Sequence, residues 1–441
     1  MRLMQKFLIT LLFFCSTMLS QTWQHFDTSN SSLPGNVINS IIFGGDGVVW
    51  IATDNGLASY NSDTWKTYST TDGLSSNLVH DLLFLTGENN LWLGTDSGST
   101  DFMVNGDQIA SNPEYYNKAT NNILSNNILA LGIDNRSNIW LGTDAGISIL
   151  LQSGIRNITV GAPNIGDGLK SNIISGFAVD AEGQINVATK NGGISRFNVD
   201  EVDAVSSASI VEETWSALPS DSIFAIHIGS DNVSWFGTEK GIVTFLGGDS
   251  KAQSNWLAYY HTGNGLIDNR VTSITEDNAG NIWVGTKGGV SYFNGIEWNS
   301  FTTDNGLVSN NISTIAIDAD NNIWIGSDSG LMELSDFTVD TEGNNSLPEK
   351  YDLDISVYPN PFNPSTNINY TIQESGKITI SIFDLTGQKV KTLVNEFTSK
   401  GEHQKKWNGL SDNGEQMPSG VYFVLLNSKS STATQKIVLL R

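Results

Sequence analysis

Residues 277–290 read DNAGNIWVGTKGGV. A turn-forming tetrad, residues 277–280, precedes an alternating run that ends at Thr286, and a second run begins at Gly289 after a short loop. The central phrase of this stretch, residues 283–286, recurs along the chain at intervals of 42, 48, 46, 49, 48 and 41 residues. The seven copies begin at Trp50, Trp92, Trp140, Asn186, Trp235, Trp283 and Trp324.

Each repeat unit is long enough for four short strands. In the sixth unit the expected strands are residues 271–276, 281–286, 289–293 and 298–302, because apolar and polar residues alternate there between glycine and aspartate turns. A repeat of 41 to 49 residues with four strands per unit is typical of a β-propeller blade. We therefore predict an all-β fold in which residues 21–335 form a seven-bladed β-propeller.

The last unit, residues 312–334, has no clear fourth strand, whereas the start of the predicted mature chain carries Trp23 and Phe26. An open ring would leave unpaired strand edges, which favour aggregation. We predict that the N-terminal strand completes the seventh blade, so that Trp23 lies in the outer strand of the blade that contains Trp324.

The repeated phrase, best preserved in residues 277–290 and 318–331, resembles the two-component regulator propeller repeat. This family forms the periplasmic sensor part of hybrid histidine kinases and also occurs in secreted proteins. The fourth copy departs most from the pattern, with Asn186 in place of the tryptophan. No kinase or receiver sequence follows the repeats, so we expect no signalling within this chain.

Residues 1–20 have the features of a signal peptide. Arg2 and Lys6 precede an apolar run, residues 7–14, and small polar residues follow it. The run is too short to span a bilayer, and no later stretch is long and apolar enough to do so. A buried N-terminal helix, or a lipid anchor at Cys15, is an alternative. Cys15 is the only cysteine, so the mature chain is expected to form no internal disulfide and no thiolate metal site.

The C-terminal part differs in composition and charge. Residues 350–441 carry 10 Lys and Arg against 8 Asp and Glu, whereas residues 1–349 carry 13 against 38. Residues 336–352 have no strand pattern and are predicted to be a linker. Apolar and polar residues alternate strongly in residues 353–441. In a segment of this short length, the alternation predicts a small immunoglobulin-like β-sandwich.

Four motifs of this tail, in order, look like the type A sorting domain of type IX secretion. They are residues 358–366, 384–390, 419–422 and 436–441. The resemblance implies that residues 353–441 contact the type IX secretion machinery and that the protein is secreted or placed on the outer cell surface. Because the whole chain has a net charge of -23, we expect no nucleic-acid partner.

The loops that enter the first strands and the loops between second and third strands should open on one face of the ring, around the mouth of the channel. Candidate ligand-binding residues there are Asn36, Asn77, Asn127, Asn172, Arg270 and Asn311. The alternative is that the asparagines only hold turn backbones. Second-loop carboxylates, at Asp54, Asp96, Asp144, Glu239 and Asp328, stand too far apart for a shared calcium ion. We predict no metal site and no cofactor.

His80 and His227 are the histidines nearest the predicted channel, and we include them among the candidate ligand-binding residues. The sequence has no nucleophile elbow, phosphate-binding glycine loop or metal-spaced histidine pair, so no catalytic residue is nominated. The favoured function is non-catalytic binding of a glycan, peptide or partner protein. The alternative is a secreted polysaccharide lyase or hydrolase with its site at the mouth, using His80 or His227 with mouth carboxylates. This alternative gains support if both histidines point into the channel within hydrogen-bond reach of an acid.

Overall fold

The computed structural model describes residues 22–45, 47–161, 168–199, 205–211, 218–245, 256–295, 297–335, 354–359, 362–372, 376–384, 389–427 and 432–439. The predicted signal peptide, residues 1–20, and the predicted linker, residues 336–352, lie outside them. The chain divides into two compact units, Met1–Thr338 and Val339–Arg441. Its described elements are almost all strands, which confirms the all-β prediction.

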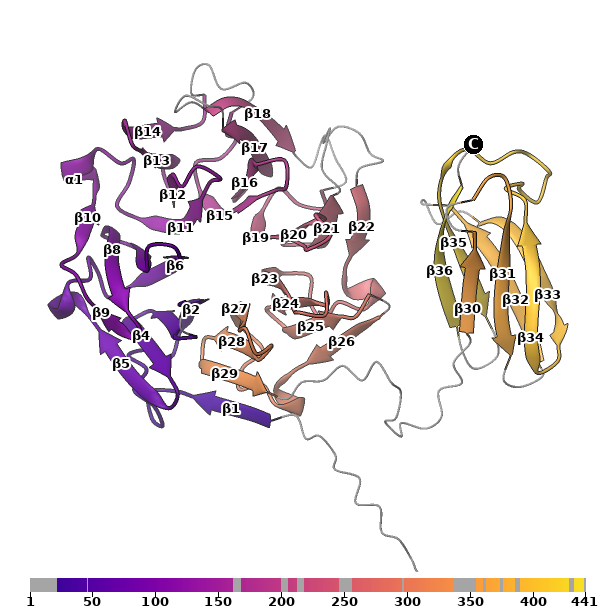
Figure 1. The fold of residues 1–441 in the computed structure, drawn as a ribbon, viewed down its shortest axis with the longest axis horizontal. Helices are drawn as coiled ribbons and strands as arrows, with labels where there is room; N and C mark the ends of the chain where they lie inside the picture. The colour runs from indigo at the N-terminus through magenta and orange to yellow at the C-terminus, as the bar shows by residue number, and fades with distance from the viewer. Residues whose placement is uncertain are drawn as a thin grey trace, which may run out of the picture. The chain divides into compact units, whose positions relative to one another are not determined.

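The described strands of the first unit form seven antiparallel sheets arranged around a ring (Figure 1). In chain order, the first four sheets contain β2 (Ile38–Phe43), β3 (Val49–Thr53), β4 (Gly56–Asn61) and β5 (Thr64–Tyr68); β6 (Val79–Leu85), β7 (Asn90–Thr95), β8 (Gly98–Asn105), β9 (Gln108–Ile109) and β10 (Glu114–Tyr116); β11 (Ile128–Ile133), β12 (Ile139–Thr143), β13 (Ile147–Leu151) and β14 (Gly154–Ile158); and β15 (Ile174–Val179), β16 (Gln184–Thr189), β17 (Ile194–Val199) and β18 (Val205–Val211). The other three contain β19 (Ile223–Ile228), β20 (Ser234–Thr238), β21 (Gly241–Phe245) and β22 (Trp256–Tyr260); β23 (Val271–Glu276), β24 (Ile282–Thr286), β25 (Gly289–Phe293) and β26 (Trp298–Phe301); and β27 (Ile312–Ile317), β28 (Ile323–Ser327), β29 (Gly330–Ser335) and β1 (Thr22–Phe26). Short helices lie between sheets, at α1 (Lys118–Asn121), η1 (Thr70–Asp72), η3 (Thr262–Asn264) and η4 (Thr303–Asn305).

The first strand of each sheet lines the centre of the ring (Figure 1). Each of these strands contacts the first strand of the next sheet, and β27 contacts β2 in the same way. Side chains near the strand starts bond across these contacts: Ser175 Oγ donates to the carbonyl of Ile223 at 2.6 Å, and Thr272 Oγ1 to that of Ile312 at 2.8 Å. The same kind of bond joins the last sheet to the first, from Ser313 to Ile38.

The N-terminal strand β1 pairs with β29 as the outermost strand of the sheet that contains Trp324. Trp23 lies opposite Leu334 in this antiparallel pair, which confirms the prediction for the N-terminal strand. Phe26 is buried and its ring stacks on Trp324, with centroids 6.3 Å apart and planes 5° apart. One sheet is thus built from residues more than 300 positions apart in the sequence.

Most of the tryptophans that begin the repeated four-residue phrase are buried between neighbouring sheets. In three repeats the indole Nε1 donates to an aspartate six residues earlier, in the turn between the first and second strands. The pairs are Trp140 with Asp134 at 3.0 Å, Trp283 with Asp277 at 3.1 Å and Trp324 with Asp318 at 3.0 Å. The same aspartates accept from backbone N–H groups of their turns, so one carboxylate fixes both the turn and the core side chain.

The fourth repeat has a different buried group where the tryptophan is missing. Asp180 forms a buried ion pair with Arg196, 2.7 Å between Oδ2 and Nη2, and Arg196 Nε donates to Asn186 Oδ1 at 3.0 Å. The guanidinium also lies over the ring of Phe245, 5.1 Å from its centroid. Arg196 therefore fills the space of the indole and keeps the aspartate paired.

The second unit contains two antiparallel sheets. One sheet is formed by β30 (Asp354–Tyr358), β31 (Thr366–Ile372) and β34 (Gly401–Trp407), and the other by β33 (Lys389–Thr398), β32 (Gly376–Phe383), β35 (Gly420–Asn427) and β36 (Thr432–Leu439). Side chains from both sheets form one buried cluster around Trp407, whose indole Nε1 donates to the carbonyl of Leu410 at 3.0 Å.

Candidate functional site at the channel mouth

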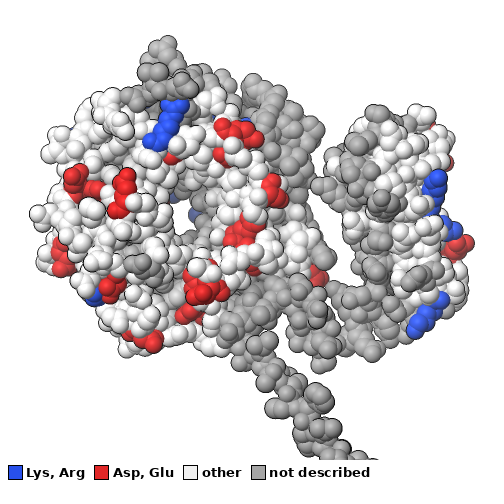
Figure 2. Space-filling model, viewed as in Figure 1, with Lys and Arg blue, Asp and Glu red and all other residues white. Residues whose placement is uncertain are grey.

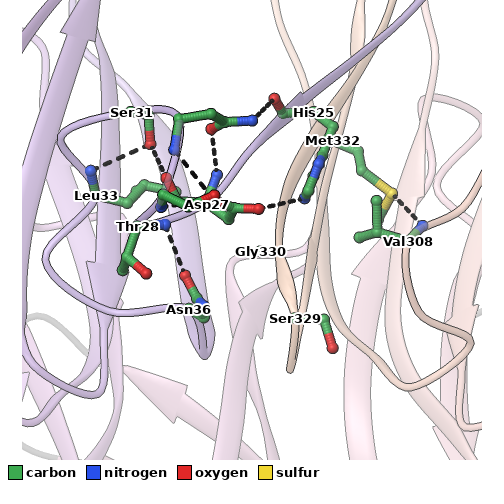
Figure 3. Close-up of polar contacts among 12 residues, drawn as sticks. His25, Asp27, Thr28, Ser31, Leu33, Asn36, Val308, Ser329, Gly330 and Met332 are labelled. Carbon is green, nitrogen blue, oxygen red and sulfur yellow. Dashed lines mark hydrogen bonds and ion pairs between the residues drawn. The ribbon is translucent and has the colours of Figure 1, made fainter.

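The loops that enter the first strands are held by a repeated asparagine. Its side-chain oxygen accepts the N–H of a residue just after the preceding outer strand. These bonds join Asn36 to Thr28 at 2.8 Å (Figure 3), Asn77 to Thr70 at 2.8 Å and Asn172 to Val160 at 2.7 Å. Three other repeats make the same bond, from Asn126 to Lys118, Asn269 to Thr262 and Asn310 to Thr303.

The six candidate residues of these loops were predicted to occupy equivalent positions at the mouth, and the structure shows that they do not. Asn127, Arg270 and Asn311 each follow the loop-holding asparagine by one residue, so their side chains do not occupy the same position as that of Asn36. Instead they contact acids of the loops between second and third strands. Asn127 Nδ2 donates to Asp144 at 3.2 Å, Asn311 Nδ2 to Asp328 at 2.7 Å, and Arg270 Nη1 lies 3.4 Å from Glu239.

The predicted residues therefore fall into two groups. The side chains of Asn36, Asn77 and Asn172 support loop backbones, whereas those of Asn127, Arg270 and Asn311 form polar pairs at the mouth. The Arg270 guanidinium also lies 5.0 Å from the ring centroid of Phe224. We call Asn127, Arg270 and Asn311, with their acidic partners, the mouth pairs.

The residue after the Thr or Ser of each phrase is exposed in all seven repeats. In ring order these residues are Asp54, Asp96, Asp144, Lys190, Glu239, Lys287 and Asp328. Sequence reasoning missed the two lysines, although aligning the seven phrases at this position finds them. Hydrogen bonds from Ser309 and then Asn311 hold the pKa of Asp328 below its usual value, so this acid keeps its charge. Figure 2 shows acidic side chains spread over one face of the ring around a central hollow.

Within the channel lies a cavity of about 190 Å³, lined by first-strand residues that include Asp81, Ser175, Phe224, Thr272 and Ser273. Asp81 accepts from Ser40 Oγ at 2.9 Å and from the N–H of Leu131 at 2.8 Å. Burial raises the pKa of Asp81 in spite of these bonds. The cavity is thus lined by residues that carry hydroxyls, one carboxyl group and two aromatic rings, those of Phe177 and Phe224.

His80 and His227 lie at opposite ends of their strands. His80 is the second residue of β6, near the mouth, and burial lowers its pKa although Asp96 and Asn127 oppose the shift. His227 is the fifth residue of β19, where its Nε2 lies 3.4 Å from Glu276 Oε2 near the other face of the ring. The structure therefore does not bring the two candidate histidines together.

Among the described residues, no group of three or more His, Cys, Asp and Glu side chains is arranged to hold a metal ion. Within the same part of the chain, no helix has the length and apolar character that crossing a membrane requires. What the mouth provides is a set of exposed, oriented hydrogen-bonding groups of both charges, which suits recognition of a polar ligand.

Two protein families match parts of the chain. The two component regulator propeller family matches residues 32–55, 265–288 and 306–329. The secretion system C-terminal sorting domain family matches residues 356–440. No curated protein matches the sequence significantly.

Several solved structures share the fold at low sequence identity. The extracellular domain of BT3049 from B. thetaiotaomicron, described as a hybrid two component system, is 20% identical, with a TM-score of 0.58 over 95% of this chain and 57% of that one. PorZ of Porphyromonas gingivalis, a surface component of the type IX secretion system, is also 20% identical, with a TM-score of 0.55 over 92% and 60%. Virginiamycin B lyase from Staphylococcus aureus is 16% identical, with a TM-score of 0.53 over 71% and 99%.

The chain spans only about three fifths of the length of the first two proteins. At these identities the likeness concerns the fold alone. The chain carries two-component regulator propeller repeats and, at residues 356–440, a secretion-system C-terminal sorting domain, and it is a propeller protein exported to the cell surface or the medium.

Proposed function

We propose that this protein is a non-catalytic recognition module, a closed seven-bladed propeller at residues 21–335 that binds a ligand or partner at the channel mouth. An immunoglobulin-like sandwich at residues 353–441 delivers it through the type IX machinery, after removal of a signal peptide at residues 1–20 and across a linker at residues 336–352. The observation that carries the binding proposal is the set of mouth pairs, in which half-buried Asn127 and Asn311 and exposed Arg270 orient exposed acids.

The charge of the mouth restricts the ligand. Five of the seven exposed residues that follow the phrases are acidic and two are basic, and residues 1–349 carry a large excess of acids. Polyanions would be repelled, so the favoured ligands are peptides, protein segments or glycans that are neutral or cationic. Binding of a cationic ligand should weaken as salt is raised, because exposed charges are screened, whereas binding of a neutral ligand should change little.

The enzyme alternative, a polysaccharide lyase or hydrolase, is less well supported. It would use His80 or His227 with mouth carboxylates. His227 lies beside Glu276 at the end of its strand away from the mouth, which leaves His80 as the candidate histidine near the mouth. The virginiamycin B lyase fold is shared only at 16% identity, which says nothing about chemistry.

The test is an array of peptides and glycans probed with the exported protein, followed by two substitutions. Asn127→Ala should weaken capture of the ligand with little change in melting temperature, because the side chain of Asn127 donates to another side chain and holds no backbone group. Asn172→Ala should lower the melting temperature, because Asn172 holds a loop backbone. Asn172 is thus the matched structural control. If Asn127→Ala leaves capture of every array ligand unchanged, the mouth is not the binding site.

A further inference from the structure

A second cavity lies at the other end of the strands from the mouth, between the sheets of β6–β10 and β11–β14. Its volume is about 460 Å³, and it is lined from one sheet by residues 84–88, Asn90 and Trp92, and from the other by Ile133, Ser137 and Ile139. The turn that joins β6 to β7 forms part of its wall. We call this cavity the inter-sheet groove. It is within the size range of pockets that bind small molecules.

The groove exists where the repeat departs from its usual pattern. In three other repeats an aspartate six residues before the phrase accepts the indole N–H. The residue six positions before Trp92 is Thr86. Trp92 is only 6% exposed, and its Nε1 has no hydrogen-bond partner among the described residues. A buried indole donor without an acceptor costs free energy, which a bound acceptor would recover.

Two unpaired oxygens lie beside this indole. Asn90 is on the same face of β7, two residues before Trp92, and Asp101 is directly opposite Trp92 on β8. Asn90 Nδ2 donates to Asp101 Oδ2 at 3.0 Å, while Asn90 Oδ1 and Asp101 Oδ1 have no partner in the described part of the chain. Burial raises the pKa of Asp101. Trp92 and Asn90 line the groove and therefore offer it one donor and one acceptor, while Asp101 holds the Asn90 amide from behind.

These groups indicate the chemistry of the occupant. A hydroxyl group both donates and accepts, so a polyhydroxylated ring could accept from the Trp92 indole and donate to Asn90 Oδ1. Phe84, Leu85, Ile133 and Ile139 supply apolar walls for the C–H faces of such a ring. Glu88 in the wall, and Glu114 acting on Asp101, make the surroundings acidic, which disfavours a sugar carboxylate. A simple cation would leave the indole N–H without an acceptor.

The geometry points to a binding site for a neutral pyranose sugar in the inter-sheet groove, with Trp92 and Asn90 as its polar contacts and Asp101 holding the Asn90 amide in place. This site is separate from the mouth and does not depend on the function proposed there. The chain offers an internal control, because Trp50 is also fully buried with an unpartnered Nε1 among the described residues but does not line the groove.

The experiment follows indole ¹H–¹⁵N NMR signals of the exported protein labelled at tryptophan, with Trp92→Phe and Trp50→Phe used to assign the two signals. Methyl glycosides of glucose, galactose and mannose are titrated, with methyl glucuronide as the acidic comparison. We expect at least one neutral glycoside to shift the Trp92 signal saturably while the Trp50 signal stays in place, and the glucuronide to bind at least about tenfold more weakly.

Asn90→Ala should weaken the binding by about tenfold or more, since it removes one acceptor and releases Asp101. Asp101→Asn, which keeps the size of the side chain, is the second variant if Asn90→Ala does not fold. The proposal is overturned if no neutral glycoside moves the Trp92 signal, which would mean that water alone fills the groove. It is equally overturned if the Trp50 signal moves in parallel, or if the folded variant binds as tightly as the original chain.

Discussion

Replacement of Asp277 tests the repeated hydrogen bond between an aspartate of the turn and the indole of the tryptophan six residues later. Asp277 is buried and accepts from the N–H of Ala279 at 2.9 Å, from Asn281 through its N–H and its amide, and from the indole of Trp283 at 3.1 Å. Asp277→Ala removes the acceptor of all these donors. Ala279 is exposed and can turn to water, but Asn281 and Trp283 are buried.

The expected loss follows from the three buried donors, the N–H and amide of Asn281 and the indole N–H. Leaving a buried donor unpaired costs about 1 to 3 kcal/mol, so we expect Asp277→Ala to lower the free energy of unfolding by about 3 to 9 kcal/mol. At roughly 2 °C for each kcal/mol, the melting temperature should fall by about 6 to 18 °C. Asp277→Asn keeps one oxygen but turns an N–H group toward a donor, and should cost less than Asp277→Ala.

Urea denaturation followed by tryptophan fluorescence, together with thermal melting, measures these losses. The matched control is Asp320→Ala, in the corresponding turn of the next repeat, where the side chain is exposed. It should change stability by no more than about 0.5 kcal/mol. Equal stability of Asp277→Ala and Asp320→Ala would refute the view that the carboxylate holds the turn and the indole together.

Three further predictions use the same measurements. Phe26→Ala should lower stability by about 3 to 5 kcal/mol, because a buried aromatic ring of the closing strand is lost; a loss below about 1 kcal/mol would mean that β1 contributes little to closure. Burial lowers the pKa of His227 against the opposing effect of Glu276, so the unfolded chain takes up a proton below about pH 6.5 that the folded chain resists. Stability should therefore fall as the pH drops below that value, and His227→Gln should make the fall smaller; an unchanged pH dependence would contradict this. Gly289 has a φ of 133°, and a Cβ there would lie 2.4 Å from the carbonyl oxygen of Phe301, so Gly289→Ala should destabilise the sheet by more than about 1 kcal/mol, whereas Gly176→Ala, which meets only a contact at 3.9 Å, should not.

The periodic phrase was sufficient to predict the strands and their grouping. In the sixth repeat, the predicted strands agree with β23, β24, β25 and β26 to within one residue at each end. The place of Trp23 in the outer strand of the sheet that contains Trp324 was also predictable, because the last repeat lacked a fourth strand and the N-terminus offered one. These features follow from strand alternation and from the need to cover sheet edges.

The orientation of the mouth residues was not predictable in the same way. Asn126 and Asn127 are adjacent, as are Asn310 and Asn311, and neighbouring residues of extended backbone point in opposite directions. An error of one residue therefore exchanges a loop-holding side chain for one at the mouth. A buried apolar residue lies three positions before each loop-holding asparagine, so aligning the repeats on this residue identifies the correct asparagine. These apolar residues are Leu33, Leu74, Ile123, Leu169, Leu266 and Leu307.

The histidines show a second limit of sequence reasoning. His80 and His227 were placed on equivalent strands correctly, but a strand of six or seven residues spans the ring from one face to the other. Their positions differ only when residues are counted from the start of each strand: His80 is the second residue of its strand and His227 is the fifth. Strand assignment alone therefore cannot place two side chains in one site.

The departures from the repeat are more informative about function than the repeat itself. Where the aspartate and tryptophan are both present, their polar atoms satisfy each other, as in Asp277 and Trp283. In the fourth repeat, where the tryptophan is absent, Arg196 forms an ion pair with the buried aspartate, Asp180. Where the aspartate is lost beside Trp92, no replacement pairs the indole among the described residues, and a cavity opens there. The unpaired indole of Trp92 borders a cavity, and this coincidence of an unpaired polar atom with open space is what a binding site requires.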